Sequence, residues 1–485
     1  MDSVRPAGSL TVRPLPETDI DRALDLAYLV FHDTPEEEKR KHHHDLLLGC
    51  ERIGTYDGDT LVGLLATFPF TVSVPGGELP CCGLSFVSVA PTHRRRGVLS
   101  GMIGKLYERC AADGVPVAVL WASEDAIYGR FGFGPATHGN TVEVHTERPL
   151  ALRITPDDGA LRLVDPADAP ALLGPYYDRT RADRGGRIAR DQAWWSEEWL
   201  VTKDQEDDEL SPPRVVVLGP RAAASLDAGH PQDTAHPQDT DHPDSAGHPQ
   251  NTADSQDITG YAIYRTKSRD DTPGLVRLDE LEADTPQATA ALWRYLADID
   301  LTGLIRAWGR PLDDPLLLFA ADRDQVRVTG QFPALRLRLV DVGAAFRARS
   351  WAAPVDLVLE VRDPQLPAND GRFRLTVPAS GTDATTPGTD ATPPGTDATT
   401  YGHPATTYGH AATAYGHTRA TYEPTTDPAD LTVDVRDLAA AYLGGVTGLT
   451  AVVRAGLATE HTPGAAAALD SALRTERLPH TVDEF

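Results

Sequence analysis

A run of three arginines and a glycine, residues 94–97, is the segment of this chain with the clearest capacity for chemistry. It follows an apolar, β-branched run at residues 86–90, and a helical pattern begins at Val98. In this order the turn and the first helical turn expose backbone N–H groups, and the helix dipole favours an anion beside them. The arginines add fixed positive charge. The pattern predicts a phosphate-binding loop. The alternative is a solvated basic turn, which is what most charge runs are.

The motifs around this loop resemble a known family. The loop is similar to the acetyl-CoA signature of the GNAT N-acetyltransferases, with Leu99 where glycine or alanine is usual. Four segments resemble the enhanced intracellular survival (Eis) family of aminoglycoside acetyltransferases: residues 83–97, 122–124, 127–137 and the ending Glu484-Phe485. The resemblance implies an α/β (α+β) chain with a GNAT fold, a second degenerate GNAT-like domain and a sterol-carrier-protein-like C-terminal domain. It also implies acetyl-CoA as co-substrate, no metal, and a homohexamer.

The resemblance places acetyl-CoA on three parts of the sequence. The strand before the arginine loop offers backbone groups to the pantetheine arm, the loop and its helix surround the pyrophosphate, and the end of the next strand touches the co-substrate. The expected contacts are Val87, Ser88, Val89, Arg95, Arg96, Gly97, Val98, Leu99, Ser100, Ser123 and Glu124.

Acetyl transfer to an amine needs a proton donor for the leaving thiolate and a base for the ammonium. Tyr128 is the candidate acid, because a phenol with a pKa of about 10 keeps its proton at neutral pH. Its position also matches the proton donor of the resembling enzymes. The alternative is a loop tyrosine that only packs. The resemblance assigns the base to the C-terminal carboxylate, here that of Phe485, and the alternative is a frayed terminus.

A cationic polyamine acceptor favours carboxylates and aromatic rings around the site. By resemblance the acceptor pocket is lined by Phe31, Asp33, Ser85, Phe86, Trp195 and Glu484. Each aromatic residue can equally belong to a core, and Trp195 is uncertain because Trp194 and Trp199 lie close to it in sequence. Asp33 can instead cap a helix that begins at Pro35.

Three regions are expected to position these groups. Residues 1–152 form the N-terminal GNAT domain, with a strand at 84–90 and a helix from about 98 to 112. A buried strand at 117–122 should pair parallel to 84–90, because the intervening helix is a crossover connection. Residues 153–320 form the second GNAT-like domain, and residues 325–485 form the sterol-carrier-protein-like domain.

Periodicity and composition add two expectations for these later domains. Leu335, Leu337 and Leu339 alternate with other residues, including two arginines, which predicts a half-buried strand. Low-complexity repeats at about 221–258 and 379–427 contain too few apolar residues to offset the entropy of ordering, and we interpret both as disordered insertions.

Charge and targeting signals narrow the class of protein. Lys and Arg total 45 against 71 Asp and Glu, a formal net charge of −26. This balance argues against a nucleic-acid partner and suits a cationic substrate. The sequence shows no signal segment and no run of about 18 apolar residues, so we expect a soluble, cytoplasmic protein without a membrane partner. The four cysteines have neither disulfide nor zinc spacing.

Together these observations predict an acetyl-CoA-dependent N-acetyltransferase that acts on aminoglycoside-like polyamines by direct transfer, with no covalent enzyme intermediate. Two alternatives remain open. The same machinery would acetylate a protein lysine or a small metabolite amine. A non-catalytic protein that binds acyl-CoA and an apolar ligand would bind the co-substrate without turnover.

Overall fold

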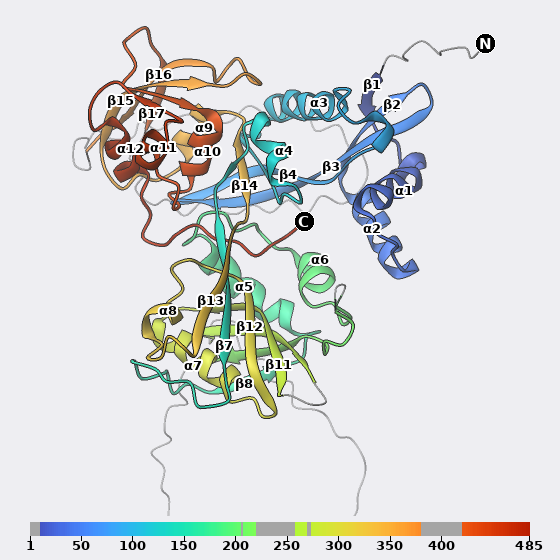
Figure 1. Ribbon diagram of the computed structural model, residues 1–485, viewed down its shortest axis with the longest axis vertical. Coiled ribbons are helices and arrows are strands. Elements are labelled where there is room, and N and C mark those ends of the chain that lie inside the picture. Colours follow the sequence, from blue (N-terminus) through green and yellow to red (C-terminus); the bar gives the residue numbers. More distant parts are fainter. Residues whose placement is uncertain (1–9, 205–206, 220–257, 269–272, 380–419) are drawn as a thin grey trace, which may run out of the picture. The chain divides into compact units, whose positions relative to one another are not determined.

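The computed structural model describes residues 10–204, 207–219, 258–268, 273–379 and 420–485 (Figure 1). It divides into two compact units. The first consists of Met1–His138, Ala182–Ala189 and Pro333–Phe485, and the second of Gly139–Arg181 and Arg190–Phe332. Both contain mixed sheets with helices packed on them, so the predicted α/β class is confirmed.

A seven-stranded sheet forms the centre of the first unit. Its strands, in spatial order, are β1 (Leu10–Pro14), β2 (Glu51–Asp57), β3 (Thr60–Val74), β4 (Gly77–Val89), β5 (Val117–Leu120), β14 (Arg336–Leu339) and β6 (Gly134–Pro135). β4 and β5 pair parallel, which confirms the predicted crossover, and the remaining neighbours pair antiparallel.

Helices cover both faces of this sheet. In the first unit, the helical elements before residue 138 are η1 (Glu17–Asp19), α1 (Ile20–Phe31), α2 (Glu37–Gly49), η2 (Pro91–His93), α3 (Val98–Asp113), α4 (Asp125–Tyr128) and η3 (Gly129–Phe131). Val62 and Leu65 of β3 share a core with α3, whereas Leu64 and Ala66 share one with α1. This arrangement holds the arginine loop at one end of α3.

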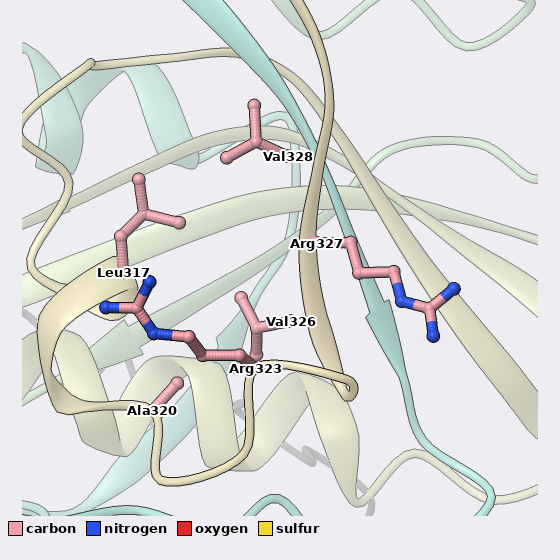
Figure 2. A pocket seen from close by; sticks show the side chains of 6 residues that line it. All are labelled: Leu317, Ala320, Arg323, Val326, Arg327 and Val328. Carbon is pink, nitrogen blue, oxygen red and sulfur yellow. The ribbon is translucent and has the colours of Figure 1, made fainter.

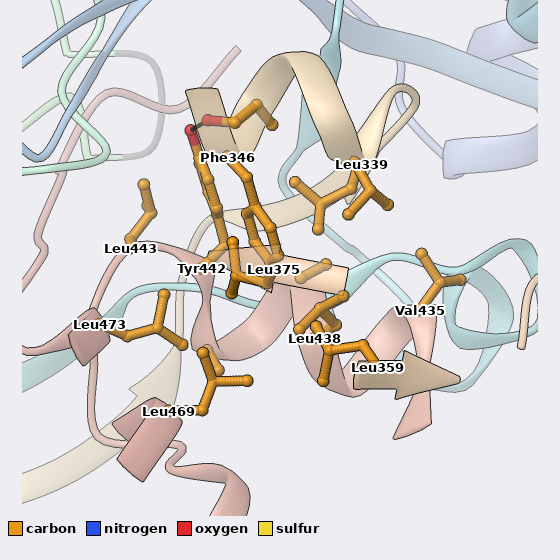
Figure 3. Packing of buried hydrophobic residues seen from close by; sticks show 14 of the residues in the cluster. Leu339, Phe346, Leu359, Leu375, Val435, Leu438, Tyr442, Leu443, Leu469 and Leu473 are labelled. Carbon is orange, nitrogen blue, oxygen red and sulfur yellow. Dashed lines mark hydrogen bonds between the residues drawn. The ribbon is translucent and has the colours of Figure 1, made fainter. Parts of the chain in front are cut away.

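The rest of the first unit is a smaller α/β layer. Its sheet has the order β17 (Thr421–Pro424), β16 (Gly371–Val377), β15 (Val355–Arg362), β18 (Leu431–Asp434) and β19 (Thr459–Glu460). Four helices accompany it: α9 (Val342–Ala348), α10 (Val435–Tyr442), α11 (Leu449–Arg454) and α12 (Ala465–Leu473). Figure 3 shows Phe346 and Tyr442 among leucines from α10, α12, β15 and β16, in one continuous core.

The second unit has its own seven-stranded sheet. Its spatial order is β13 (Val326–Pro333), β7 (His138–His145), β12 (Thr302–Arg310), β11 (Gly274–Ala283), β10 (Gly260–Lys267), β9 (Arg214–Leu218) and β8 (Leu161–Val164). The helices are α5 (Ala169–Arg181), α6 (Gln192–Trp194), the π-helical η4 (Trp195–Trp199), α7 (Pro286–Ala297) and α8 (Leu316–Phe319). One core lies under α7 and another under α5 and η4.

Two strands pair outside the sequence regions in which we expected them. β7 lies within residues 1–152, yet it pairs with β12 in the second sheet. β14 lies within residues 325–485, yet it pairs with β5 and β6 in the first sheet. Each large sheet therefore contains one strand from outside the sequence region that supplies its other strands: β7 in the second sheet and β14 in the first.

The expectation that the 335–339 strand is half-buried is wrong. Arg336 and Arg338 are only 4% and 0% exposed, because both faces of β14 are covered. Arg338 donates to Asp363 at 2.6 Å and lies over the ring of Tyr107. A paired arginine can be buried, so the alternation of leucine and arginine did not mark a solvent face.

The limits of the two insertions also differ from the structure. Thr421–Pro424, inside the expected insertion 379–427, is strand β17 and pairs with β16. Ile258, the last residue of the other insertion, is buried in a core of the second unit. Residues 220–257 and 380–419 of these insertions lie outside the described part of the chain. Of the helices that are described, none is both long and apolar enough to cross a membrane.

Candidate active site

A β-bulge in β4 opens the first sheet beside the arginine loop. Leu64 of β3 pairs with Ser88, and Ala66 pairs with Ser85, so one β3 residue faces two residues of β4. Phe86 lies in the bulge with φ of 51°, a conformation that a residue with a Cβ rarely adopts and that marks local strain.

The parallel partner of β4 also stops at this point. Leu84 with Leu120 is the last register pair between β4 and β5. Beyond it the two strands separate, and the register assigns residues 85–89 no partner in β5. The bulge and the end of the β5 pairing leave residues 85–89 of β4 without a partner in β5 on that side, as contact with a pantetheine arm requires.

The arginine loop enters α3 through two left-handed residues, Arg95 with φ of 61° and Gly97 with φ of 81°. Gly97 is the N-cap residue of α3 and provides no side-chain cap, so the first N–H groups of this helix are not satisfied by a capping side chain. Residues 94–97 are exposed. An uncapped helix N-terminus next to arginines can hold a pyrophosphate.

Close packing places α3 against the sheet at this end. A Cβ on Gly63 of β3 would lie 2.6 Å from Cγ1 of Val98, the first residue of the helix. Glycine at position 63 therefore allows the helix N-terminus to approach the strand, and with it the opening in β4.

Tyr128 is the last residue of α4, eight residues after the end of β5. Its side chain is 7% exposed and packs against Phe133 with a ring-centroid distance of 6.1 Å. Burial, together with the negative charge of Glu124, raises the pKa of Tyr128 to about 12. The phenol is therefore protonated at neutral pH, as a general acid must be. Ser123 and Glu124, between β5 and α4, are exposed.

The C-terminal residue lies against the same two strands. The ring of Phe485 contacts that of Phe70 in β3, with centroids 4.8 Å apart. A Cβ on Gly83 of β4 would lie 3.0 Å from Cε2 of Phe485. Phe86 and Phe485 both pack on the core beneath α1. The structure thus brings the last residue of the sequence to the bulged strand, while Glu484 is exposed beside it.

Two of the predicted acceptor residues lie at the end of α1 and just after it. Phe31 is 46% exposed. Asp33 accepts hydrogen bonds from the Thr34 backbone N–H at 2.7 Å and from Lys39 Nζ at 3.0 Å. The bond from Lys39 is the main reason that the pKa of Asp33 is lowered. The following helix begins at Glu37 with Glu36 as its N-cap, so the alternative that Asp33 caps a helix from Pro35 is wrong.

The chain is similar to known acetyltransferases in sequence and in domain content. Two models of an acetyltransferase (GNAT) domain match residues 11–136 and 234–339, and a sterol carrier protein domain matches residues 342–482. An N-acetyltransferase of Streptomyces avermitilis is 38% identical over 379 residues, 76% of this chain and 83% of that protein. N-acetyltransferase Eis of Mycobacterium tuberculosis is 36% identical over 338 residues, 67% of this chain and 73% of that protein.

A solved structure gives the same result over a longer span. Eis1 from Mycobacterium abscessus matches with a TM-score of 0.72 and 28% identity, covering 98% of this chain and 100% of that one. The chain belongs to the Eis family of GNAT N-acetyltransferases. It is an N-acetyltransferase, and the predicted family and its three-domain composition are confirmed.

The sequence analysis of this Eis-family enzyme missed the residue that fixes the arginine loop. Asp57, at the end of β2, lies 3.1 Å from His93 Nε2 and 3.6 Å from Arg96 Nη2. His93 Nδ1 is in turn 2.8 Å from Thr92 Oγ1. In the sequence, Asp57 belongs to Tyr56-Asp57-Gly58-Asp59, a segment whose residues are typical of a hairpin turn and give no further signal. Only the pairing of β2 with β3 places it near the loop.

A histidine beside the bulge was also missed. His43 of α2 lies 2.9 Å from the Tyr28 hydroxyl and meets the ring of Phe86 edge to face at 5.4 Å. Burial lowers the pKa of His43 to about 4, so the imidazole is neutral near pH 7. The run His42-His43-His44 on a helix next to Asp33 was the available signal.

Trp195 differs from the other predicted acceptor residues. It is 1% exposed, in the core of the second unit under α5 and η4. Its ring meets that of Tyr177 edge to face at 5.5 Å, and the guanidinium of Arg190 lies 4.6 Å from its centroid. This packing favours the alternative that Trp195 is a core residue, and we do not retain it among the acceptor contacts.

The Eis-family chain has a further hollow in its second unit. Leu317, Ala320, Arg323, Val326, Arg327 and Val328 line a space of about 460 Å³. Figure 2 shows the guanidinium of Arg323 beside Leu317, whereas Arg327 extends from the other side of β13. None of the predicted catalytic or binding residues lines this hollow.

Proposed function

We propose that this enzyme transfers acetyl groups directly from acetyl-CoA to amines of aminoglycoside-like polyamines. The observation that carries this proposal is the position of Phe485, which packs on Phe70 and Gly83 beside the bulged strand. A terminal carboxylate held there is available as a base, and ordinary chain ends are frayed.

The co-substrate site follows from the open strand and the uncapped helix. Val87, Ser88 and Val89 lie beyond the last pair of β4 with β5, and their backbone groups suit the amide groups of pantetheine. The N–H groups that begin α3, with the arginine side chains, suit the pyrophosphate. The contacts that we propose are Arg95, Arg96, Gly97, Val98, Leu99 and Ser100 on this side, and Ser123 and Glu124 at the end of β5.

In the proposed reaction the Phe485 carboxylate accepts a proton from the acceptor ammonium. The neutral amine then attacks the thioester carbonyl carbon, and a backbone N–H of the bulged strand stabilises the oxyanion. The carbon–sulfur bond breaks as the amide forms, and Tyr128 donates its proton to the departing thiolate. The attacking nitrogen loses its second proton as the amide forms, and this proton restores the Tyr128 phenol. The proton accepted by the carboxylate returns to solvent, so one proton is released for each amide formed.

The acceptor class rests on the side chains around the Phe485 end. Asp33 and Glu484 supply negative charge, Phe31 and Phe86 supply aromatic faces, and Ser85 supplies a hydroxyl. The net charge of −26 favours polycations. We further propose that the enzyme acts in the cytoplasm as a homohexamer, as its family resemblance implies.

The test is thiol release from acetyl-CoA by untagged protein with an aminoglycoside, a simple polyamine and a lysine peptide. We expect turnover with the aminoglycoside, and a loss of about 100-fold when Phe485 is deleted. The variant Phe485→Leu, which keeps a terminal carboxylate at position 485, should lose less activity than the deletion.

Two results would change the proposal. Undiminished turnover after deletion of Phe485 would remove the carboxylate from the mechanism and leave the acetyltransferase. Turnover with the lysine peptide alone would favour the alternative acceptor, a protein lysine.

A further inference from the structure

The C-terminal tail, residues 474–485, contains no helix or strand, yet much of it is buried. His480, Thr481 and Asp483 are 3%, 2% and 2% exposed. Ordering an irregular chain end costs conformational entropy, so specific contacts must hold it. The structure identifies donors and acceptors that do so.

A short piece of chain, residues 182–189, forms the first set of contacts, and we call it the tail-binding segment. Arg184, 9% exposed, donates from Nη1 to the Leu478 carbonyl at 2.7 Å. The backbone N–H of His480 donates to the Gly185 carbonyl at 2.9 Å. The tail is thus hydrogen-bonded to this segment at two positions two residues apart.

The tail-binding segment is itself fixed to β3. The Ser73 N–H donates to the Arg187 carbonyl at 2.8 Å, and the Ala189 N–H donates to the Thr71 carbonyl at 2.9 Å. The chain on either side of the segment belongs to the second unit, whereas the segment belongs to the first. It therefore forms part of the same compact body as the proposed active site.

Gly186 of the tail-binding segment has a conformation that favours glycine, and it lies close to Thr137. Its φ is 98°, and a Cβ there would lie 2.7 Å from Cγ2 of Thr137 and 3.7 Å from the His480 carbonyl oxygen. A glycine at this position satisfies both the backbone conformation and the limited space.

Trp121 forms the contact nearest the chain end. Its indole Nε1 donates to the carbonyl of Asp483, two residues before Phe485. Trp121 directly follows β5, and the segment after it carries Ser123, Glu124 and Tyr128. One hydrogen bond therefore joins the tail to the strand end from which the proposed co-substrate contacts and the proposed acid extend.

We propose that Trp121 and Arg184 are positioning residues that hold the tail so that the Phe485 carboxylate lies in the active site. This inference rests on the proposed function, because it assigns their effect to that carboxylate. Neither side chain touches the reacting atoms in this scheme. Both act through the tail, Arg184 at Leu478 and Trp121 at Asp483.

The first experiment measures the tail itself, without reference to catalysis. A carboxypeptidase that releases aromatic C-terminal residues is added to the folded, untagged protein, and loss of Phe485 is followed by mass spectrometry. Trp121→Phe and Arg184→Ala should each be trimmed about fivefold faster than the parent enzyme, because each lacks one hydrogen bond that orders the tail. Unchanged trimming in both variants would overturn the proposal.

The matched control is Trp351→Phe. Trp351 lies in the same unit, and its Nε1 donates to the Phe346 carbonyl at 3.2 Å, away from the tail. The Trp351→Phe variant should lose Phe485 to the carboxypeptidase at the rate of the parent enzyme, and its kcat should be unchanged. Thermal unfolding of each variant shows whether the fold is intact, and Arg184→Lys, which keeps a donor, should recover part of the effect.

The second experiment measures turnover in two backgrounds. Trp121→Phe and Arg184→Ala should lower kcat about tenfold and leave the KM for acetyl-CoA unchanged. In protein that lacks Phe485, the same substitutions should have no further effect. A full loss in that background would assign them a role independent of the tail and overturn the proposal.

The failures of the two proposals are distinguishable. If deletion of Phe485 leaves kcat unchanged, the carboxylate mechanism fails. If the deletion abolishes turnover while both substituted enzymes keep the kcat of the parent enzyme, only the positioning role fails.

Discussion

The two large sheets of this enzyme share a plan and differ at one end. Each contains a parallel strand pair joined by a helix: β4 and β5 through α3, and β11 and β12 through α7. The first strand of each pair has a bulge against its antiparallel neighbour. The comparison shows which local changes turn this plan into a binding site.

The helix starts differ in their caps. α7 begins after Thr285, whose hydroxyl accepts the Ala288 N–H at 3.1 Å, and Pro286 follows at the first helical position. α3 begins after Gly97, which has no side chain to accept a bond. The N-terminus of α7 is therefore capped by its own residues, whereas the N–H groups at the N-terminus of α3 remain able to bind an anion.

The space beyond the bulge differs as well. In the second sheet Glu280 of β11 forms a two-point ion pair with Arg190, at 2.8 and 2.9 Å, and accepts the Tyr261 hydroxyl. The guanidinium also lies 4.0 Å from the ring centroid of Tyr177. Beyond Leu278 and Ala307, the last register pair of β11 with β12, these side chains fill the region. The two sheets share a framework, and we place the proposed site at the end of the first sheet beside α3.

The largest effect on stability should come from removing the buried ion pair between Glu280 and Arg190 in the second sheet. Glu280→Ala leaves the Arg190 guanidinium, whose side chain is 0% exposed, without its carboxylate. We expect a loss of about 3–5 kcal/mol in the free energy of unfolding. Urea unfolding followed by tryptophan fluorescence measures it, since five of the seven tryptophans lie in the second unit.

The control is an exposed ion pair of the same sheet. Arg306 and Glu143 lie 2.9 Å apart, and Arg306→Ala should cost less than about 1 kcal/mol. Equal losses for the buried and the exposed pair would contradict the role we give to the filled end.

The next effect concerns the open end, where the first unit has Tyr128. Tyr128→Phe removes the proposed proton donor and should lower kcat about 100-fold at neutral pH, with little change in the KM for acetyl-CoA. Stopped-flow or steady-state thiol release measures it. Unchanged kcat would assign protonation of the thiolate to another group.

The pH profile tests the same residue in the parent enzyme. Because burial and Glu124 raise the pKa of Tyr128 to about 12, the phenol stays protonated as the pH rises past the ordinary value of about 10. Kcat should therefore show no decline below about pH 10 from ionisation of this acid. A decline in kcat with an apparent pKa near 9 that is absent from Tyr128→Phe would show that the pKa of the phenol is not raised.

A smaller effect should follow from a Cβ at the open helix start. Gly97→Ala forces a side chain into φ of 81°, at a cost of about 1–2 kcal/mol, and we expect the KM for acetyl-CoA to rise about tenfold. Gly464 is a matched control, because it is the N-cap of α12 with φ of 90° and has nothing within 4 Å of its Cβ position. Gly464→Ala should lose similar stability and keep its KM.

The smallest effect should come from the closed helix start. Thr285→Ala removes the cap of α7 and should cost about 1 kcal/mol of stability in the second unit. The KM for acetyl-CoA should not change. A rise in KM would mean that the second sheet takes part in binding the co-substrate.

Local signals in the sequence predicted much of the first unit. The strand at 84–90, the helix from about 98 to 112 and the parallel pairing of the strand at 117–122 each follow from periodicity or connection length. The basic loop before α3 was predicted for the same reason, because strand, turn and helix follow one another directly in the chain.

The remainder depended on contacts between distant parts of the sequence. Asp57 reaches His93 only because β2 and β3 pair, and His43 reaches Phe86 only because α2 packs near β4. Arg336 and Arg338 looked like exposed residues until β14 was placed between two other strands. No local pattern distinguishes an arginine in such a strand from one at the surface.

The position of β14 has a consequence for biosynthesis. A ribosome must add about 215 residues after Leu120 before Arg336, the first residue of this strand, is polymerised, which takes on the order of ten to forty seconds. During that interval the edge of β5 lacks its neighbour and is exposed to pairing with other chains. A truncated product that ends before β14 retains the arginine loop but not the complete sheet. Expression of the first 152 residues alone should therefore yield an aggregating fragment.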